Sequence, residues 1–171
     1  MLDNIILIGF MGCGKTTFGT WIAKNKKMDF CDTDALIVEK EKKSINDIFS
    51  ENGETYFREL ETEIVKDLIK SRHNTVVSVG GGLPLKPENR ELLKKLGTVV
   101  YLRTSVEELT KRLTGDTTRP LLAGGNIREK ITHLMDMRLS DYLDAAEVII
   151  DTDGRSFDEM YENILKEKRE A

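Results

Sequence analysis

At 171 residues the chain has room for one domain with a substantial core and is too short for two ordinary ones. Its 39% hydrophobic and 33% charged residues are typical of a globular protein, and a net charge of −4 argues against a nucleic-acid scaffold, so we expect no nucleic-acid partner. No apolar stretch is as long as a membrane span, and the first strand begins almost at once, so we expect no membrane partner and no signal or transit peptide.

Short apolar runs alternate with longer helical patterns along the chain. This alternation predicts βα units, and therefore an α/β fold with a parallel sheet and helices on both of its faces. A three-layer sandwich is the expected architecture. The predicted strands lie near residues 4–9, 29–33, 75–80, 98–103 and 147–151.

The first predicted strand runs directly into residues 9–16, GFMGCGKT, which match the phosphate-binding P-loop pattern without a mismatch. Glycines there allow successive N–H groups to face phosphate oxygens. Lys15 would contact the β and γ phosphates, and Thr16 would offer its hydroxyl to Mg²⁺ where the next helix, residues 15–27, begins. Trp21 is expected in the core behind that helix. The alternative is a glycine turn that only joins a strand to a helix.

The second predicted strand ends in Asp32-Thr33-Asp34. Carboxyl ends of parallel strands border the ligand crevice of such sheets. Because the strand at 75–80 ends in glycines and has no terminal aspartate, we assign support of Mg²⁺ to Asp32, and acceptance or orientation of an attacking hydroxyl to Asp34. A helix cap at residues 32–34 would explain the same letters.

A helix is predicted from about residue 55 to residue 72, with Arg58 and Glu61 on neighbouring positions of one face. The strand that follows ends in Gly80, Gly81 and Gly82. Such a triplet supplies no side chain to pack, so we expect a polyhydroxylated or carboxylated small molecule against its backbone, with a tight turn as the alternative. Pro84 and Pro87 then mark the start of a helix that ends near Gly97.

Residues 114–126 are rich in turn formers and lie between two strongly patterned helices. A loop of this length is usually functional, so we interpret it as a lid that closes over bound phosphates, the alternative being a flexible insertion. Arg119 would then stabilise charge on the transferring phosphate. Arg58, Arg119 and Arg138 come from three elements and could converge on a small anion.

Cysteine and histidine give no sign of a metal or disulfide site. Cys13 and Cys31 are too few and too poorly spaced, and we expect reduced thiols in a cytoplasmic protein. His73 and His133 have no partners at ligand or catalytic spacing and are expected at the surface or in helix packing.

Five segments occur in the order of one known family: residues 9–17 (GFMGCGKTT), 32–34 (DTD), 53–61 (GETYFRELE), 80–82 (GGG) and 119–122 (RPLL). Together they resemble shikimate kinases over nearly the whole chain. The resemblance implies a P-loop kinase fold related to nucleoside monophosphate kinases, with a five-stranded parallel sheet in the order 2-3-1-4-5. It implies a single P-loop kinase domain over residues 1–171, with a shikimate-binding subregion at 33–62 and a lid at 113–126.

The resemblance also implies an activity, which is ATP-dependent phosphorylation of the 3-hydroxyl of shikimate to shikimate 3-phosphate and ADP, in chorismate and aromatic amino-acid biosynthesis. Lys15, Asp34 and Arg119 match catalytic positions, and Thr16 and Asp32 match the Mg²⁺ environment. Expected ATP contacts are Gly12, Cys13, Gly14, Lys15, Thr16, Thr17, Arg112, Arg119 and Arg155, of which the two arginines at 112 and 155 flank the adenine. Expected shikimate contacts are Asp34, Arg58, Glu61, Gly80, Gly81, Gly82 and Arg138. A monomer is expected.

Two other functions fit parts of the pattern. A GTPase-like switch would use residues 151–154 as D-x-x-G, but they follow the last strand and precede no switch helix. A gluconate kinase shares the P-loop and the lid, whereas the Arg58–Glu61 pair, the triple glycine and the RPLL segment resemble shikimate kinases more closely.

Overall fold

The computed structural model describes residues 3–170 as a three-layer α/β/α sandwich around a five-stranded sheet. All neighbouring strands are parallel, in the order β2-β3-β1-β4-β5. The predicted class, strand count and order are therefore confirmed. The strands are β1 (Ile5–Ile8), β2 (Asp29–Asp32), β3 (Thr75–Ser78), β4 (Thr98–Arg103) and β5 (Val148–Asp151).

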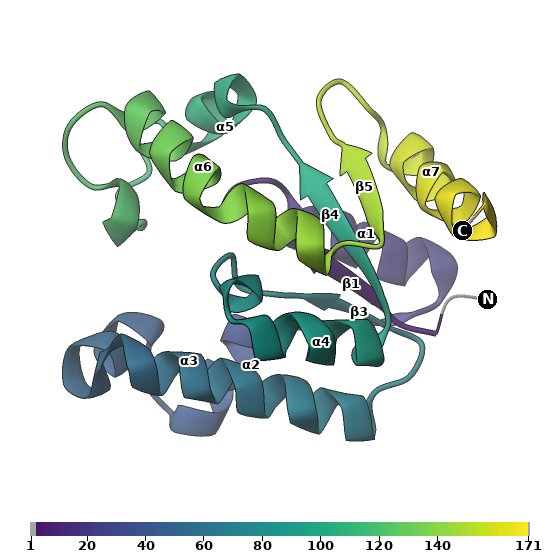
Figure 1. Ribbon diagram of the computed structural model, residues 1–171, viewed down its shortest axis with the longest axis horizontal. Helices are drawn as coiled ribbons and strands as arrows, with labels where there is room; N and C mark the ends of the chain where they lie inside the picture. The colour runs from purple at the N-terminus through teal and green to yellow at the C-terminus, as the bar shows by residue number, and fades with distance from the viewer. Residues whose placement is uncertain (1–2, 171) are drawn as a thin grey trace.

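Alternation along β1 divides the core into two layers, because successive side chains of a strand point to opposite faces. Ile6 and Ile8 join one apolar cluster, and Ile5 and Leu7 join the other. The first cluster is covered by α2 (Thr33–Glu41), α3 (Ile45–Ser71), α4 (Pro87–Leu96) and the C-terminal half of α6 (Ile127–Ala145). The second is covered by α1 (Lys15–Lys26), α5 (Val106–Leu113), the start of α6 and α7 (Phe157–Glu170). Figure 1 shows α3, α4 and α6 in front of the sheet and α1 behind it.

Three local details differ from the sequence prediction. The helix expected at residues 55–72 begins ten residues earlier as α3, and it is interrupted by Gly53, whose φ of 84° and ψ of 171° are not helical. The second strand ends at Asp32, so Asp34 lies in the first turn of α2. Trp21 is half-buried at the edge of its cluster, against Phe18 and Phe157, and is not a central core residue.

The predicted lid leaves the body of the protein between α5 and α6 (Figure 1). Its one regular turn is the 3-10 helix η2 (Pro120–Leu122), directly after Arg119. Gly115, Gly124 and Gly125 all have positive φ, so the loop turns sharply at both ends. A second 3-10 turn, η1 (Leu83–Leu85), connects the glycine triplet to α4.

Within residues 3–170, no helix is both long enough and apolar enough to cross a membrane. Cys13 and Cys31 are both buried free thiols. His73 and His133 lie on the surface, as expected.

Candidate active site

The P-loop follows β1, the central strand, and wraps around the side chain of its own lysine. Lys15 Nζ donates to the carbonyls of Gly9 (2.8 Å) and Phe10 (3.1 Å). Gly12 and Gly14 have φ values of 80° and 98°, which a residue with a Cβ adopts only with strain. Gly14 is the N-cap of α1, and no side chain in the described part of the chain caps that terminus. Its first N–H groups and the helix dipole are therefore available to an anion.

A hollow of about 300 Å³ lies over this loop. Besides the loop itself, Asp32 and Arg119 line it, at the carboxyl end of β2 and in the lid. Loop residues that line it are Met11, Gly12, Gly14, Lys15, Thr16 and Thr17. Cys13 is buried beneath the loop, with its sulfur 3.7 Å from Lys15 Nζ. The structure thus brings the predicted phosphate-contacting residues together.

Asp32 has the helix-cap role that was the alternative interpretation of its sequence. Its Oδ1 accepts from the Ala35 N–H at 3.1 Å, at the N-terminus of α2. It also borders the phosphate hollow together with Thr16, an exposed residue. These are hard oxygen donors, and they fit a divalent cation that takes most of its ligands from phosphate and water. Within residues 3–170, no three His, Cys, Asp or Glu side chains form a metal-binding group by themselves.

A second hollow, of about 290 Å³, adjoins the first. Met11, Asp34, Gly80, Gly81 and Arg119 line both hollows, so they form a shared wall. The second hollow also contains Phe57, Arg58, Glu61, Gly82 and Arg138. The three arginines predicted to converge do so: each borders this cavity from a different element. A molecule here would lie beside whatever occupies the phosphate hollow.

The arginine cluster is built around a buried carboxylate. Arg58 Nη1 donates to Glu61 Oε2 at 2.7 Å, and Glu61 is only 1% exposed. Burial raises the pKa of Glu61 to about 7, although the Arg58 guanidinium opposes that rise. Arg138 is also buried, with its guanidinium 5.8 Å from the centre of the Phe10 ring. The cluster supplies two held cations to an acidic ligand.

Charged side chains of the cavity pack against the glycine triplet, in the space that a Cβ would fill. A Cβ on Gly80 would lie 2.9 Å from Asp34 Oδ1, and one on Gly82 would lie 2.5 Å from Arg58 Nη2. At Gly81 the nearest atom would be Arg138 Nη1, at 3.3 Å. The same three glycines therefore form the tight turn and part of the wall of the second hollow.

Two carboxylate oxygens of the residues that line this hollow have no hydrogen-bond partner within residues 3–170. They are Asp34 Oδ1 and Glu61 Oε1, both fully buried atoms. The pKa of Asp34 is raised, first by burial and then by Asp32, while Lys15, Arg58 and Arg119 oppose the rise. Buried acceptors without donors carry a desolvation penalty, which favours the protonated form of each carboxyl group. Asp34 also borders the phosphate hollow, so a hydroxyl on it would face the donor.

The lid holds Arg119 by a weak contact. Its Nε lies 3.5 Å from Asp116 Oδ2, while Asp116 Oδ1 accepts from the Thr118 N–H at 2.8 Å. Leu121, further along the lid, is 56% exposed and lines the second hollow. Arg119 therefore borders both hollows with little to fix its position.

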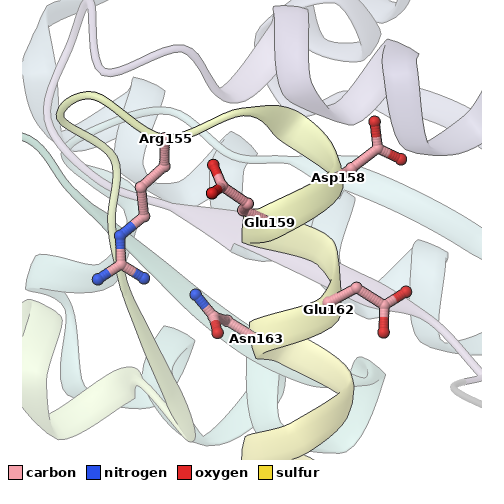
Figure 2. A pocket seen from close by; sticks show the side chains of 5 residues that line it. All are labelled: Arg155, Asp158, Glu159, Glu162 and Asn163. Carbon is pink, nitrogen blue, oxygen red and sulfur yellow. The ribbon is translucent and has the colours of Figure 1, made fainter.

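The two arginines expected at the adenine are placed differently. Arg112 Nη1 donates to the Gly12 carbonyl of the P-loop at 3.1 Å, and its Nε pairs with Glu108. Arg155 lines a separate open hollow of about 430 Å³ before and along α7. Figure 2 shows Arg155 beside Glu159 and Asn163, with Asp158 and Glu162 turned to the other side of the helix. Arg155 is not among the residues that line the two central hollows.

Sequence reasoning missed part of the cavity wall. Ile45 and Asn46, from the unpredicted first turn of α3, line the second hollow, as do Thr118, Pro120 and Leu121 of the lid. The lid residues lie in the predicted lid at 113–126, and Ile45 and Asn46 lie in the predicted acceptor region at 33–62, but none of the five was named as a contact. The bend at Gly53 brings the first turn of α3 to the cavity.

A parallel sheet of this order, with a P-loop after its central strand, belongs to the P-loop kinases. The family model described as "Shikimate kinase" matches residues 11–169. A shikimate kinase from Enterococcus faecalis is 44% identical over 99% of this chain and 100% of that protein. The chain belongs to the shikimate kinase family.

Solved structures agree with this assignment. A shikimate kinase from Acinetobacter baumannii, in complex with shikimate, superimposes with a TM-score of 0.89 at 37% identity, over 99% of this chain and 94% of that chain. A gluconokinase from Sinorhizobium meliloti reaches a TM-score of 0.54 at 18% identity, over 98% of this chain and 91% of that chain. The second likeness shows a shared fold only.

Proposed function

We propose that this protein transfers the γ-phosphate of ATP to the 3-hydroxyl of shikimate, giving shikimate 3-phosphate and ADP. The observation that carries this proposal is the wall shared by the two hollows, with Asp34 on it and Arg58 and Arg138 beyond it. A carboxylate held by those arginines would leave the ring hydroxyls toward Asp34. Family membership supports the choice of acceptor.

In this proposal the donor side is formed by the P-loop N–H groups, Lys15 and the start of α1. Arg119 closes over the transferring phosphate from the lid, and Arg112 contributes near the nucleotide from α5. Direct in-line transfer needs mainly positioning and neutralisation of charge. Asp34 orients the attacking hydroxyl and accepts its proton late in the transfer. Arg155 remains a predicted adenine contact.

The cation would be Mg²⁺, held by the Thr16 hydroxyl and, through water, by Asp32. When bound, it neutralises charge on the β and γ phosphates. The proposal further includes one domain, with an acceptor region at 33–62 and a lid at 113–126. A monomeric, cytoplasmic enzyme without nucleic-acid or membrane partners completes it.

A GTPase-like switch has no support in the geometry of residues 151–154. Asp151 is paired with Arg103, and Asp153 accepts from the Ser105 N–H at 3.2 Å. Both aspartates therefore tie the ends of β4 and β5 together.

The test is a coupled ADP-release assay with ATP and three acceptors: shikimate, gluconate and a set of nucleoside monophosphates. We expect turnover with shikimate at least a hundredfold above the others. Turnover with gluconate or a nucleotide alone would refute the proposed acceptor. Replacing ATP by GTP in the same assay measures nucleotide preference.

A further inference from the structure

Two buried tyrosines stack behind the glycine triplet, and their hydroxyls have different surroundings. Tyr101 of β4 and Tyr142 of α6 are both 0% exposed, with ring centres 5.2 Å apart. The Tyr142 hydroxyl donates to the Gly81 carbonyl at 2.7 Å, across 61 positions of sequence. The Tyr101 hydroxyl has no partner within the described residues. Tyr142 therefore holds a specific peptide group, and Tyr101 contributes packing.

The peptide that Tyr142 holds joins Gly81 to Gly82. In a planar trans peptide the C=O of one residue and the N–H of the next point in opposite directions. Because the Gly81 carbonyl points into the core toward Tyr142, the Gly82 N–H points away from the core. Gly82 lines the second hollow, against Arg58. The Tyr142 hydroxyl thus fixes the direction of a donor at the cavity wall.

The Gly82 N–H has no acceptor within residues 3–170 and can donate to a ligand. Gly80 N–H donates to the Thr33 hydroxyl at 3.1 Å. Within residues 3–170, the N–H groups of Gly81 and Gly82 donate to no protein acceptor. Glycine has no Cβ to restrict its backbone, so without a contact at the Gly81 carbonyl this peptide could rotate. The Leu83 N–H donates to the Gly80 carbonyl at 3.0 Å and closes the turn around this peptide, and the hydroxyl on α6 is the contact that sets the direction of its carbonyl.

Tyr142 also lies one turn after Arg138 on α6, on the same helix face. Arg138 Nη1 is the nearest atom to the Cβ position of Gly81. Burial raises the pKa of Tyr142 far above its usual range, and Arg138 opposes this rise. The hydroxyl therefore keeps its proton at neutral pH and remains a donor. α6 positions both the arginine and the glycine loop.

We propose that Tyr142 is a positioning residue for the acceptor, which orients the Gly81–Gly82 peptide so that its N–H donates to an oxygen of the bound hydroxy acid. This inference rests on the proposed function and adds a residue that touches no substrate. Acceptor affinity then depends on a hydroxyl buried behind the binding surface.

The test compares Tyr142→Phe with Tyr101→Phe, which removes an equally buried but unpartnered hydroxyl from the adjacent ring. We expect Tyr142→Phe to raise the shikimate KM about three- to tenfold, the range for one net hydrogen bond, with kcat and the ATP KM within about twofold. Tyr101→Phe should leave all three constants unchanged. Equal effects of the two variants, or a loss confined to kcat, would overturn the proposal.

A second measurement does not depend on turnover. In the ligand-free protein labelled with ¹³C and ¹⁵N, Tyr142→Phe should shift the Gly81 carbonyl resonance upfield, as expected when a carbonyl loses its donor, and Tyr101→Phe should not. An unchanged Gly81 resonance would overturn the orientation argument even in an active enzyme. A different outcome is that Tyr142→Phe shifts the Gly81 resonance but the wild-type protein does not phosphorylate shikimate. That outcome would refute the proposed function, and with it the role of Tyr142 toward that acceptor.

Discussion

Arg58 is the residue on which the second hollow most depends. It lies between the buried Glu61 and the exposed Glu54, at 2.7 and 3.4 Å. An exposed ion pair contributes little, so Glu61 is the partner that fixes the guanidinium. Glu61 accepts from Nη1, whereas Nη2 has only a long contact with the exposed Glu54 that a ligand carboxylate could replace.

Arg58→Ala should raise the shikimate KM by about 10- to 100-fold, which is the range for a lost charged hydrogen bond. The ATP KM should stay within about twofold, because Arg58 does not line the phosphate hollow. Initial rates over a matrix of both substrates measure the two constants. Unaltered kinetics at every shikimate concentration would contradict the assignment.

Glu61 should make the protein less stable as pH rises. Its pKa is about 7 in the folded protein, against an ordinary value of 4.5 in the unfolded chain, so between these values the folded chain holds a proton that the unfolded chain has lost. Stability therefore falls from pH 4.5 to pH 7, by about 3 kcal/mol for this group. Urea unfolding at pH 5 and pH 8 should show this loss in the wild type and not in Glu61→Gln. Parallel pH dependence of the two proteins would refute it.

At the scale of the element, α3 determines the shape of the acceptor cavity. Gly53 divides it into an arm that carries Ile45 and Asn46 and a longer arm that carries Phe57, Arg58 and Glu61. Both arms line the second hollow. The bend uses a backbone conformation that is almost restricted to glycine.

Gly53→Ala should therefore destabilise the protein by about 1–3 kcal/mol, although an added Cβ would meet no atom within 4 Å. The cause would be backbone strain alone. Asn52→Ala is the matched control, an exposed neighbour with helical angles, and should change stability by less than about 0.5 kcal/mol. Urea midpoints measure both. Equal midpoints for the two variants would mean that the bend is unstrained.

The same element shows what sequence could and could not predict. The strands and the 58–61 pair were predictable because they depend on local period and spacing. The start of α3 was missed because Gly53 resembles a helix breaker, and only packing on the core continues the helix beyond it. The cap at Asp32 was among the alternatives because it is a local contact with Ala35, whereas the bond from Tyr142 to Gly81 was not predictable because it joins residues 61 positions apart. The P-loop and glycine triplet were predictable because each is contiguous.

For the whole molecule, the important feature is that two cavities share a wall on a parallel sheet. Gly80, Gly81 and Asp34 of this wall follow the carboxyl ends of the strands β3 and β2, whereas Arg119 comes from the lid. A ligand in the second hollow would contact α2, α3, α6 and the loop after β3 at once. Its binding should therefore stabilise the global fold.

Shikimate at a hundred times its Kd should raise the melting temperature by roughly 5–10 °C, since such occupancy contributes about 2.7 kcal/mol in a chain of this length. Arg58→Ala at the same concentration should show a much smaller shift, while its response to ADP stays that of the wild type. Differential scanning calorimetry gives both values. A full shikimate shift in the variant would place the ligand elsewhere.

The lysine enclosed by its own loop affects how fast a nucleotide can bind. Lys15 donates to the Gly9 and Phe10 carbonyls, so hydrogen bonds within the loop support its curved shape. We therefore expect association to need no folding of the loop, only an exchange of partners by one ammonium group. The association rate should therefore be set by diffusion and charge, and it should fall with ionic strength. The slower events of the catalytic cycle are left to the lid.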